Sequence, residues 1–421
     1  MNLSLNVRIL YNLVNFLALP FFLYQLYWPR NNKPGFGGRW PEHFGISKAV
    51  KQVDIWLHAV SVGEVIAVTP LVKQLKQQHP ELNILLTTTT ATGYQQAEQR
   101  LSEEVTHRYA PLDLWPCISL FLLKHQPKQL WIMETELWPN WLGRCASKAI
   151  PVKLINARMS ERSARRYLKL RSATRPLFSK LDLVLAQHQD DAERFRQLGV
   201  EPARLQVTGS VKYDLPDQSQ LMEPAKQFRA AFEGRPCWIA ASTHKGEDEQ
   251  VLAMHRQLVA DYPELLLILV PRHPERFNSV AELIEQQGWQ TARRSHQQII
   301  DEKVQVYLAD TMGELMLMYA AADIAFIGGS LVPVGGHNYL EAAAMDLPMV
   351  AGSHDFNFSD ISQQLQACGA LYLSADIDAL AKQLARWLDD PQLRKQQGEQ
   401  GAEIVELNRG ALARSLQSLL E

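Results

Sequence analysis

Two successive series of short apolar runs, each run followed by an amphipathic stretch, constrain the fold of this chain more than any other feature. The runs of the first series occupy residues 54–60, 82–90, 129–136, 151–158, 181–187 and 205–210. Those of the second occupy residues 236–242, 264–274, 304–310, 324–330, 347–352 and 371–374. Short continuous apolar runs are typical of strands buried on both faces, and strands that alternate with helices form parallel sheets. The sequence therefore predicts two doubly wound α/β domains.

A polar segment with two prolines, residues 215–234, separates the two series, and we place the interdomain linker near its start. We predict a first Rossmann-like domain over residues 31–215, a second over 216–400 and a C-terminal helix over 401–421. Ligands of doubly wound folds bind at the carboxyl ends of the strands, so we expect the two domains to face a central cleft.

The N-terminal segment carries no charged residue between Ile9 and Pro29, a length sufficient for a helix that crosses a bilayer. Asn12, Asn15, Gln25 and the central Pro20 weaken the case for a span, and a helix that lies in the headgroup region is the rival interpretation. A buried core helix is the third alternative. We predict that residues 1–30 form a membrane-associated helix.

Positive charge follows this segment at Arg30, Lys33 and Arg39, whereas only Arg8 and the amino terminus precede it. Because basic residues stay on the cytoplasmic side, we expect the body of the protein at the cytoplasmic face of the membrane. The net charge of −2 gives no whole-chain signature of nucleic-acid binding, and we predict no such partner.

Four polar residues follow predicted strands of the first domain. Glu64 begins a helix after a small turn, where a carboxylate can serve as a general base or can simply complement the helix dipole. Glu134 and Glu136 follow a buried strand, and alternation places them on opposite faces. They are either functional acids at the ligand site or partners of Arg144 or Arg158 in a structural salt bridge. Lys212 follows a Gly-Ser turn and is either a charge at the ligand site or a solvated loop lysine.

The second domain gives the stronger indication, because four polar or glycine-rich loops follow successive strands. These loops are residues 241–247, 270–276, 309–319 and 328–344. Glycine lets a backbone approach a phosphate closely, and a helix that begins near Asn338 would offer its N–H groups to an anion. Glu341 is a candidate acceptor for ribose hydroxyls. The sequence therefore predicts a nucleotide site with no Walker lysine and no GxGxxG fingerprint.

No Asp-X-Asp pair stands at a strand end, and the histidines lack zinc-site spacing. We predict neither a metal nor a cofactor.

The segments HAVSVGE, METELWPN, VTGSVKYD, ASTHKGE, VPRHPER, DTMGEL and GGSLVPVGGHNYLEAA, together with the apolar N-terminus and its following GRW element, resemble the Kdo transferases of Gram-negative bacteria. The resemblance covers essentially the whole chain in the same order. It implies a GT-B fold and transfer of 3-deoxy-D-manno-oct-2-ulosonic acid (Kdo) from CMP-Kdo to the glucosamine 6-hydroxyl of a lipid A precursor, lipid IVA, at the inner membrane.

The resemblance also implies roles for individual residues. The general base of the family corresponds to Glu64, and its transition-state stabilisers correspond to Glu134 and Lys212. The positions that contact CMP in the family correspond here to Pro271, Arg272, Met312, Gly313, Glu314, Asn338, Tyr339, Leu340 and Glu341.

Two other functions remain alternatives: a GT-B enzyme that acts on a UDP-sugar, such as a transferase or a sugar 2-epimerase, and a non-catalytic membrane scaffold of the same fold. We also hypothesise that Arg158, Arg162, Arg165 and Arg166 hold acceptor phosphates or anionic headgroups.

Overall fold

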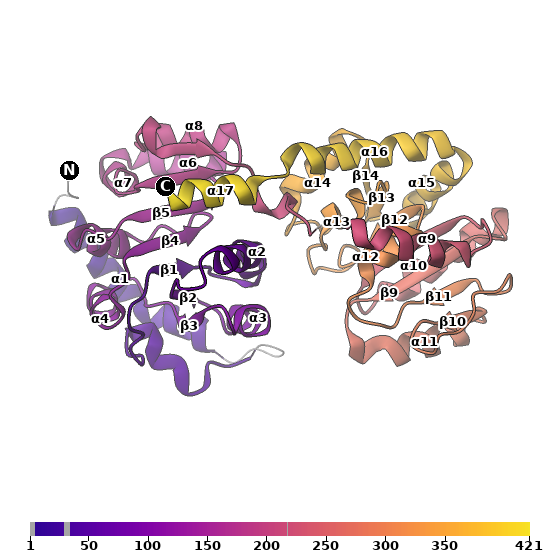
Figure 1. Cartoon of the computed structure of the whole chain (residues 1–421), viewed down its shortest axis with the longest axis horizontal. Helices are drawn as coiled ribbons and strands as arrows, with labels where there is room; N and C mark the ends of the chain where they lie inside the picture. The colour runs from indigo at the N-terminus through magenta and orange to yellow at the C-terminus, as the bar shows by residue number, and fades with distance from the viewer. Residues whose placement is uncertain (1–4, 29–33, 217) are drawn as a thin grey trace. The chain divides into compact units, whose positions relative to one another are not determined.

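The computed structural model describes residues 5–28, 34–216 and 218–421, and the chain divides into two compact units. The first unit is Met1–Asp214 together with Arg409–Glu421, and the second is Leu215–Asn408. Each unit holds a seven-stranded sheet of parallel strands with helices on both faces (Figure 1). The prediction of two parallel α/β domains is confirmed.

The first sheet has the strand order β3-β2-β1-β4-β5-β6-β7. Its strands are β1 (Ile55–His58), β2 (Ile84–Thr88), β3 (Thr106–Tyr109), β4 (Gln129–Met133), β5 (Val152–Ala157), β6 (Leu183–Ala186) and β7 (Leu205–Val207). The helices of this unit are α1 (Leu5–Tyr27), η1 (Gly37–Phe44), α2 (Val62–Gln78), α3 (Ala91–Leu101), α4 (Trp115–His125), α5 (Pro139–Ser147), α6 (Glu161–Lys169), α7 (Arg171–Phe178), α8 (Gln189–Leu198), η2 (Pro202–Arg204), η3 (Val211–Tyr213) and α17 (Ala411–Leu420).

The second sheet has the order β10-β11-β9-β8-β12-β13-β14. Its strands are β8 (Cys237–Thr243), β9 (Leu266–Pro271), β10 (Thr291–Arg293), β11 (Val306–Leu308), β12 (Ile324–Ile327), β13 (Met349–Ala351) and β14 (Leu371–Leu373). The helices are η4 (Ser219–Leu221), α9 (Met222–Ala230), α10 (Asp248–Asp261), η5 (Pro274–Arg276), α11 (Phe277–Gln286), α12 (Leu315–Ala321), α13 (Tyr339–Ala343), α14 (Ser359–Ala367), α15 (Ile377–Asp389) and α16 (Pro391–Asn408).

Alternation along the strands fills both faces of the first sheet with apolar side chains. Trp56 enters a cluster with Ile132 on one face, whereas its neighbour Leu57 enters a second cluster on the other. The second cluster also contains Leu416 and Leu419 of α17, which Figure 1 shows in yellow beside the first unit. The last helix of the chain therefore completes the core of the first unit.

The sequence analysis predicts a C-terminal helix that begins at residue 401, but the chain returns to the first unit only after Asn408. Helix α16 continues to Asn408 and stays with the second unit. Gly398 and Gly401 explain this, because a Cβ at Gly398 would meet the Asp346 carbonyl oxygen and one at Gly401 would lie 3.0 Å from the Ala370 Cβ. Both glycines let α16 pack closely on the second unit.

Helix α1 docks on the first unit through polar side chains. The Tyr11 hydroxyl donates to Asp113 Oδ2 at 2.7 Å, and Asn15 donates to the Asp113 carbonyl oxygen at 3.4 Å. At the other end of the helix, the Tyr27 hydroxyl lies 2.8 Å from His43 Nδ1. Asn15 therefore helps to dock α1 on the first unit.

Within the described residues, no helix has the length and the continuous apolar character required to cross a membrane. The predicted segment 1–30 and the basic residues Arg30 and Lys33 lie partly or wholly outside the described residues.

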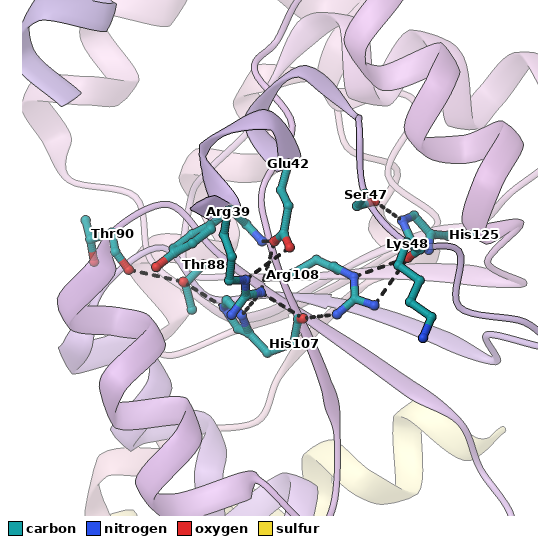
Figure 2. A network of polar contacts seen from close by, with 10 residues as sticks. Arg39, Glu42, Ser47, Lys48, Thr88, Thr90, His107, Arg108 and His125 are labelled. Carbon is teal, nitrogen blue, oxygen red and sulfur yellow. Dashed lines mark hydrogen bonds and ion pairs between the residues drawn. The ribbon is translucent and has the colours of Figure 1, made fainter. Parts of the chain in front are cut away.

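A polar network fixes η1 to the edge of the first sheet (Figure 2). Arg39 donates to both carboxylate oxygens of Glu42 at 3.0 and 2.9 Å, and also to the His107 carbonyl oxygen at 3.1 Å. Glu42 in turn accepts the Tyr109 backbone N–H at 2.8 Å, and His107 Nε2 lies 2.9 Å from the Thr88 hydroxyl. The segment that follows α1 is thus held by β3 and β2.

Candidate active site

Glu64 stands in the first turn of α2, directly after β1. The residue before the helix N-cap, Val60, donates its backbone N–H to Glu64 Oε2 at 2.9 Å. Burial, together with the negative charges of Glu134 and Glu136, raises the pKa of the Glu64 carboxyl to about 8. The Val60 N–H and Lys212 act in the opposite direction. A carboxyl group with this pKa exchanges its proton near neutral pH, as a general base requires.

Glu134 and Lys212 lie together, with Lys212 Nζ 3.5 Å from Glu134 Oε1. Glu134 follows β4 in the left-handed region at φ 54°, which is uncommon for a residue other than glycine and is frequent at functional sites. An extended continuation of β4 would place Glu134 and Glu136 on opposite faces, as the sequence analysis predicts. Strand alternation ends at Met133, and both carboxylates act on the Glu64 carboxyl.

Asn156 is a residue of this site that the sequence analysis missed. It interrupts β5 at φ 52°, where the register with β6 shifts, and it is fully buried. Its Oδ1 accepts the Val211 N–H at 3.2 Å at the start of η3, and the preceding Ile155 carbonyl accepts the Glu134 N–H at 2.9 Å. The irregular stretch of β5 therefore positions both Glu134 and Lys212. A polar, strand-disfavouring Asn inside an apolar run was the available signal.

Arg272 follows β9 in the second unit, and its side chain is exposed. Within the described part of the chain, its guanidinium has no hydrogen-bond or ion-pair partner, whereas its backbone N–H donates to the Thr243 carbonyl at 3.0 Å. The Arg272 charge acts to lower the pKa values of His244, His337 and Glu341, because these side chains lie near it. The preceding Pro271 is a buried strand residue. The positive charge of Arg272 is available to an anionic ligand.

A pair of histidines adjoins Arg272. His244 Nε2 and His337 Nε2 are 2.8 Å apart, so one proton lies between the two rings. Burial lowers the pKa of His337 to about 3, with further lowering by His244 and Arg272. The pair is therefore neutral as a whole and can donate one hydrogen bond to an oxygen without adding charge.

The Asn338–Glu341 segment departs from the expectation of a helix that binds an anion. Helix α13 has only five residues, and Asn338 caps it, since its Oδ1 accepts the Leu340 N–H at 3.1 Å. Tyr339 and Leu340 are fully buried. Asn338 Nδ2 also donates to Glu341 Oε1 at 3.1 Å, which fixes the carboxylate, while burial raises the pKa of Glu341. Of this segment, Glu341 remains the best candidate for a contact with ribose hydroxyls.

The residues from Met312 to Glu314 follow β11 in the same sheet. Met312 is 59% exposed, and Gly313 adopts φ 86° with no atom near the position of a Cβ. Glu314 instead binds Arg294 at 2.6 Å and the Thr311 hydroxyl, and Arg294 lowers its pKa. The carboxylate of Glu314 therefore supports the loop, and Met312 and Gly313 form its open surface.

Glu247 is a second residue that the sequence analysis left without a function. Its buried carboxylate accepts four backbone N–H groups, from His244, Gly329, Ser330 and Leu331, at 2.7 to 3.0 Å. It thereby holds the loop after β8 to the loop after β12. An acid four residues beyond a buried strand was the signal, since buried charge needs such partners.

Comparison with known proteins assigns the chain to a family. Residues 38–215 match the family described as 3-deoxy-D-manno-octulosonic-acid transferase (kdotransferase), and residues 238–404 match glycosyl transferases group 1. A 3-deoxy-D-manno-octulosonic acid transferase of Haemophilus influenzae is 46% identical over 367 residues, which cover 87% of this chain and 86% of the relative. The chain belongs to the Kdo transferase family. The resemblance that the motifs indicate is thus confirmed.

A second Kdo transferase, from Bordetella pertussis, is 35% identical and covers 91% of this chain and 92% of its own. Among solved structures, a UDP-GlcNAc 2-epimerase of Neisseria meningitidis superposes with a TM-score of 0.53 at 14% identity, over 88% of this chain and 100% of the epimerase. This likeness shows a shared fold alone. This chain therefore has the two-unit α/β organisation that the sequence predicts.

Proposed function

We propose that this protein transfers Kdo from CMP-Kdo to the glucosamine 6-hydroxyl of lipid IVA in lipopolysaccharide biosynthesis, with inversion at the anomeric carbon. The observation that carries the proposal is the assembly of Glu64 and Glu134, which follow the adjacent strands β1 and β4, with Lys212 of η3, in a chain of the Kdo transferase family. The assembly supplies a carboxylate whose proton affinity lies near neutral pH, next to a cation.

In the proposed reaction, Glu64 takes the proton of the acceptor hydroxyl while the hydroxyl oxygen forms its bond to the anomeric carbon. The bond from that carbon to the phosphate oxygen breaks, and CMP leaves with the electron pair. One displacement inverts the anomeric carbon, and no covalent sugar–enzyme intermediate forms. Negative charge gathers on the phosphate of the departing CMP. In the second unit, Arg272 and the His244–His337 pair offer a positive charge and a hydrogen bond to a nucleotide phosphate.

Lys212 and Glu134 adjust the charge around the base. Lys212 lowers the pKa of Glu64, whereas Glu134 raises it. The two opposite effects help to keep the pKa of the carboxyl in a range where it can both lose and take up a proton. On this proposal, the two residues stabilise the transition state through the charge that they present to the reacting groups.

We further propose that the enzyme works at the cytoplasmic face of the inner membrane, with α1 lying along the membrane surface. The exposed face of α1 carries large apolar side chains, including Phe16 at 66%, Leu17 at 70% and Phe21 at 59% exposure. A helix with such a face partitions into the interfacial region of a bilayer. A lipid acceptor is thereby found by a search in two dimensions.

The test is an in vitro reaction with CMP-Kdo and bis-phosphorylated tetra-acyl acceptor, with the product mass as readout. Glu64→Gln is expected to reduce kcat by at least about a hundredfold, as is typical for loss of a general base. Glu98→Gln, on the exposed surface of α3, is the matched control and should retain full activity. Transfer that survives in Glu64→Gln would exclude Glu64 as the base.

A nucleotide-binding measurement separates the donor from the UDP-sugar alternative. CMP is expected to raise the melting temperature of the second unit more than UDP does, and Arg272→Ala should remove most of that rise. A preference for UDP would overturn the choice of CMP-Kdo as donor.

A further inference from the structure

A cavity of about 750 Å³ lies in the first unit between the inner face of α1 and the loops that follow β2 and β3. Its walls include Leu19 and Leu26 of α1 on one side and Ala91, Leu112 and Trp138 on the other. Protein interiors are otherwise close-packed, with few voids larger than a water molecule. The volume lies within the range of about 300 to 1,000 Å³ that is usual for small-ligand sites.

The cavity exists because α1 is attached near its two ends and spans the space between them. Tyr11 and Asn15 bind Asp113 towards one end, and Tyr27 binds His43 at the other. Between these attachments Leu19 and Leu26 are only half-buried, although they point into the unit. The inner face of α1 thus presents apolar surface that the described residues do not cover.

The opposite wall of the cavity is rigidly held. Trp40 and His43 of η1 line it, and the network of Arg39, Glu42 and His107 binds η1 to the sheet edge (Figure 2). The cavity is therefore preformed on this side, and an occupant need not order that wall when it binds.

The cavity adjoins the candidate general base through a single residue. The Thr89 N–H at the cavity wall donates to the Val60 carbonyl at 3.2 Å, and the Val60 N–H donates to Glu64 at 2.9 Å. Strands β1 and β2, which carry these loops, are neighbours in the sheet and so lie about 4.8 Å apart. A molecule with its hydroxyl at Glu64 can place another of its groups in the cavity.

We propose that the cavity receives one fatty acyl chain of the lipid acceptor while the reacting hydroxyl lies at Glu64. The inference rests on the proposed function and adds an acyl-binding subsite to it. An acyl chain matches the apolar walls, and the exposed apolar face of α1 places the cavity beside the lipid phase from which such a chain comes. The subsite makes transfer depend on acylation of the acceptor as well as on its sugar.

The test compares the tetra-acyl acceptor with the same acceptor after removal of its ester-linked chains, in one detergent. Leu19→Trp and Leu112→Trp fill the cavity from opposite walls. Each is expected to lower kcat/KM for the acylated acceptor about tenfold, which corresponds to about 1.4 kcal/mol, and to leave the de-esterified acceptor unchanged. Leu13→Trp, on the exposed face of α1, is the matched control and should retain the acyl preference.

Two outcomes of this comparison overturn the subsite. One is an acyl preference that survives in both cavity-filling variants; the other is an equal loss on both acceptors while melting temperatures stay at the wild-type value.

If the wild-type enzyme transfers no Kdo, the proposed function is refuted, and the subsite is then tested by a binding measurement. A 14-carbon fatty acid with a mid-chain diazirine is expected to label peptides from 15–28 and 110–114, and Leu19→Trp should reduce this labelling about tenfold. Labelling confined to Phe16, Leu17 and Phe21 would refute the subsite. So would absence of labelling together with dimerisation through α1, since a second copy of the chain would then be the occupant.

Discussion

A carboxyl group that acts as a general base must lose its proton close to the working pH, and in Glu64 burial sets this balance. The same environment destabilises the folded state when Glu64 is ionised, because its charge has left water and no ion pair with it forms among the described residues. Activity and stability therefore place opposite demands on this residue.

Glu64→Gln is expected to stabilise the first unit in a pH-dependent way. The folded pKa of about 8 lies above the ordinary value of about 4.5, so the wild-type folded state loses stability as pH rises from 4.5 to 8. The melting-temperature advantage of Glu64→Gln should be absent below pH 4.5, grow across this window and stay constant above it. We expect a maximum on the order of 5 kcal/mol, because each unit of pKa difference corresponds to about 1.4 kcal/mol. An advantage independent of pH would refute the assigned pKa.

The neighbours of Glu64 should move the acidic limb of the kcat/KM profile in opposite directions. Glu134→Gln removes a negative charge, so the Glu64 pKa falls and the limb moves to lower pH; Lys212→Met removes a positive charge and moves it to higher pH. Lys73→Met, at an exposed site of α2, is the control and should leave the limb in place. Displacement in one common direction would contradict the assignment.

Among the elements, β5 has the largest effect on the site, because its irregular stretch places groups from two other segments. Asn156→Gly removes the acceptor of the Val211 N–H but tolerates the left-handed backbone. We expect this variant to move the acidic limb upward as Lys212→Met does, and the double variant to move it little further, since both changes act through Lys212. Additive displacements would show that Asn156 affects the Glu64 pKa by a route other than Lys212.

At the scale of elements, the predictions from sequence succeeded where burial was complete. The central strands are continuous apolar runs in the sequence, whereas the edge strands β3 and β10 were missed because polar residues interrupt them. Their sequences, Thr106–Tyr109 and Thr291–Arg293, are polar on the exposed side. Glu64, Glu134 and Lys212 were found through family motifs. Asn156 and Glu247 were not, because their importance arises from backbone groups that come together only in the fold.

Over the whole molecule, the first unit depends on the last residues of the chain. Asp214 accepts the Gly410 and Leu412 N–H groups at 2.6 and 2.5 Å, and Leu416 and Leu419 enter the core of this unit. The second unit is thus inserted between Asp214 and α17.

Leu416→Ala and Leu419→Ala together are expected to destabilise the first unit by about 4 kcal/mol or more, and to lower its melting temperature by roughly 10 °C. The melting of the second unit should not change. Leu420→Ala, at a residue 46% exposed, is the control and should have little effect. Equal destabilisation of both units would show that α17 does not belong to the first alone.

The insertion sets an order of events during synthesis. When Asp214 leaves the ribosome, the first sheet is complete but one of its faces still lacks α17. At 5 to 20 residues per second, the ribosome needs roughly 10 to 40 s to make Leu215–Asn408 before that helix emerges. The nascent protein therefore carries an exposed apolar face for much of its synthesis, and a chain that terminates early anywhere in the second unit keeps that face exposed, where chaperones and proteases can recognise it.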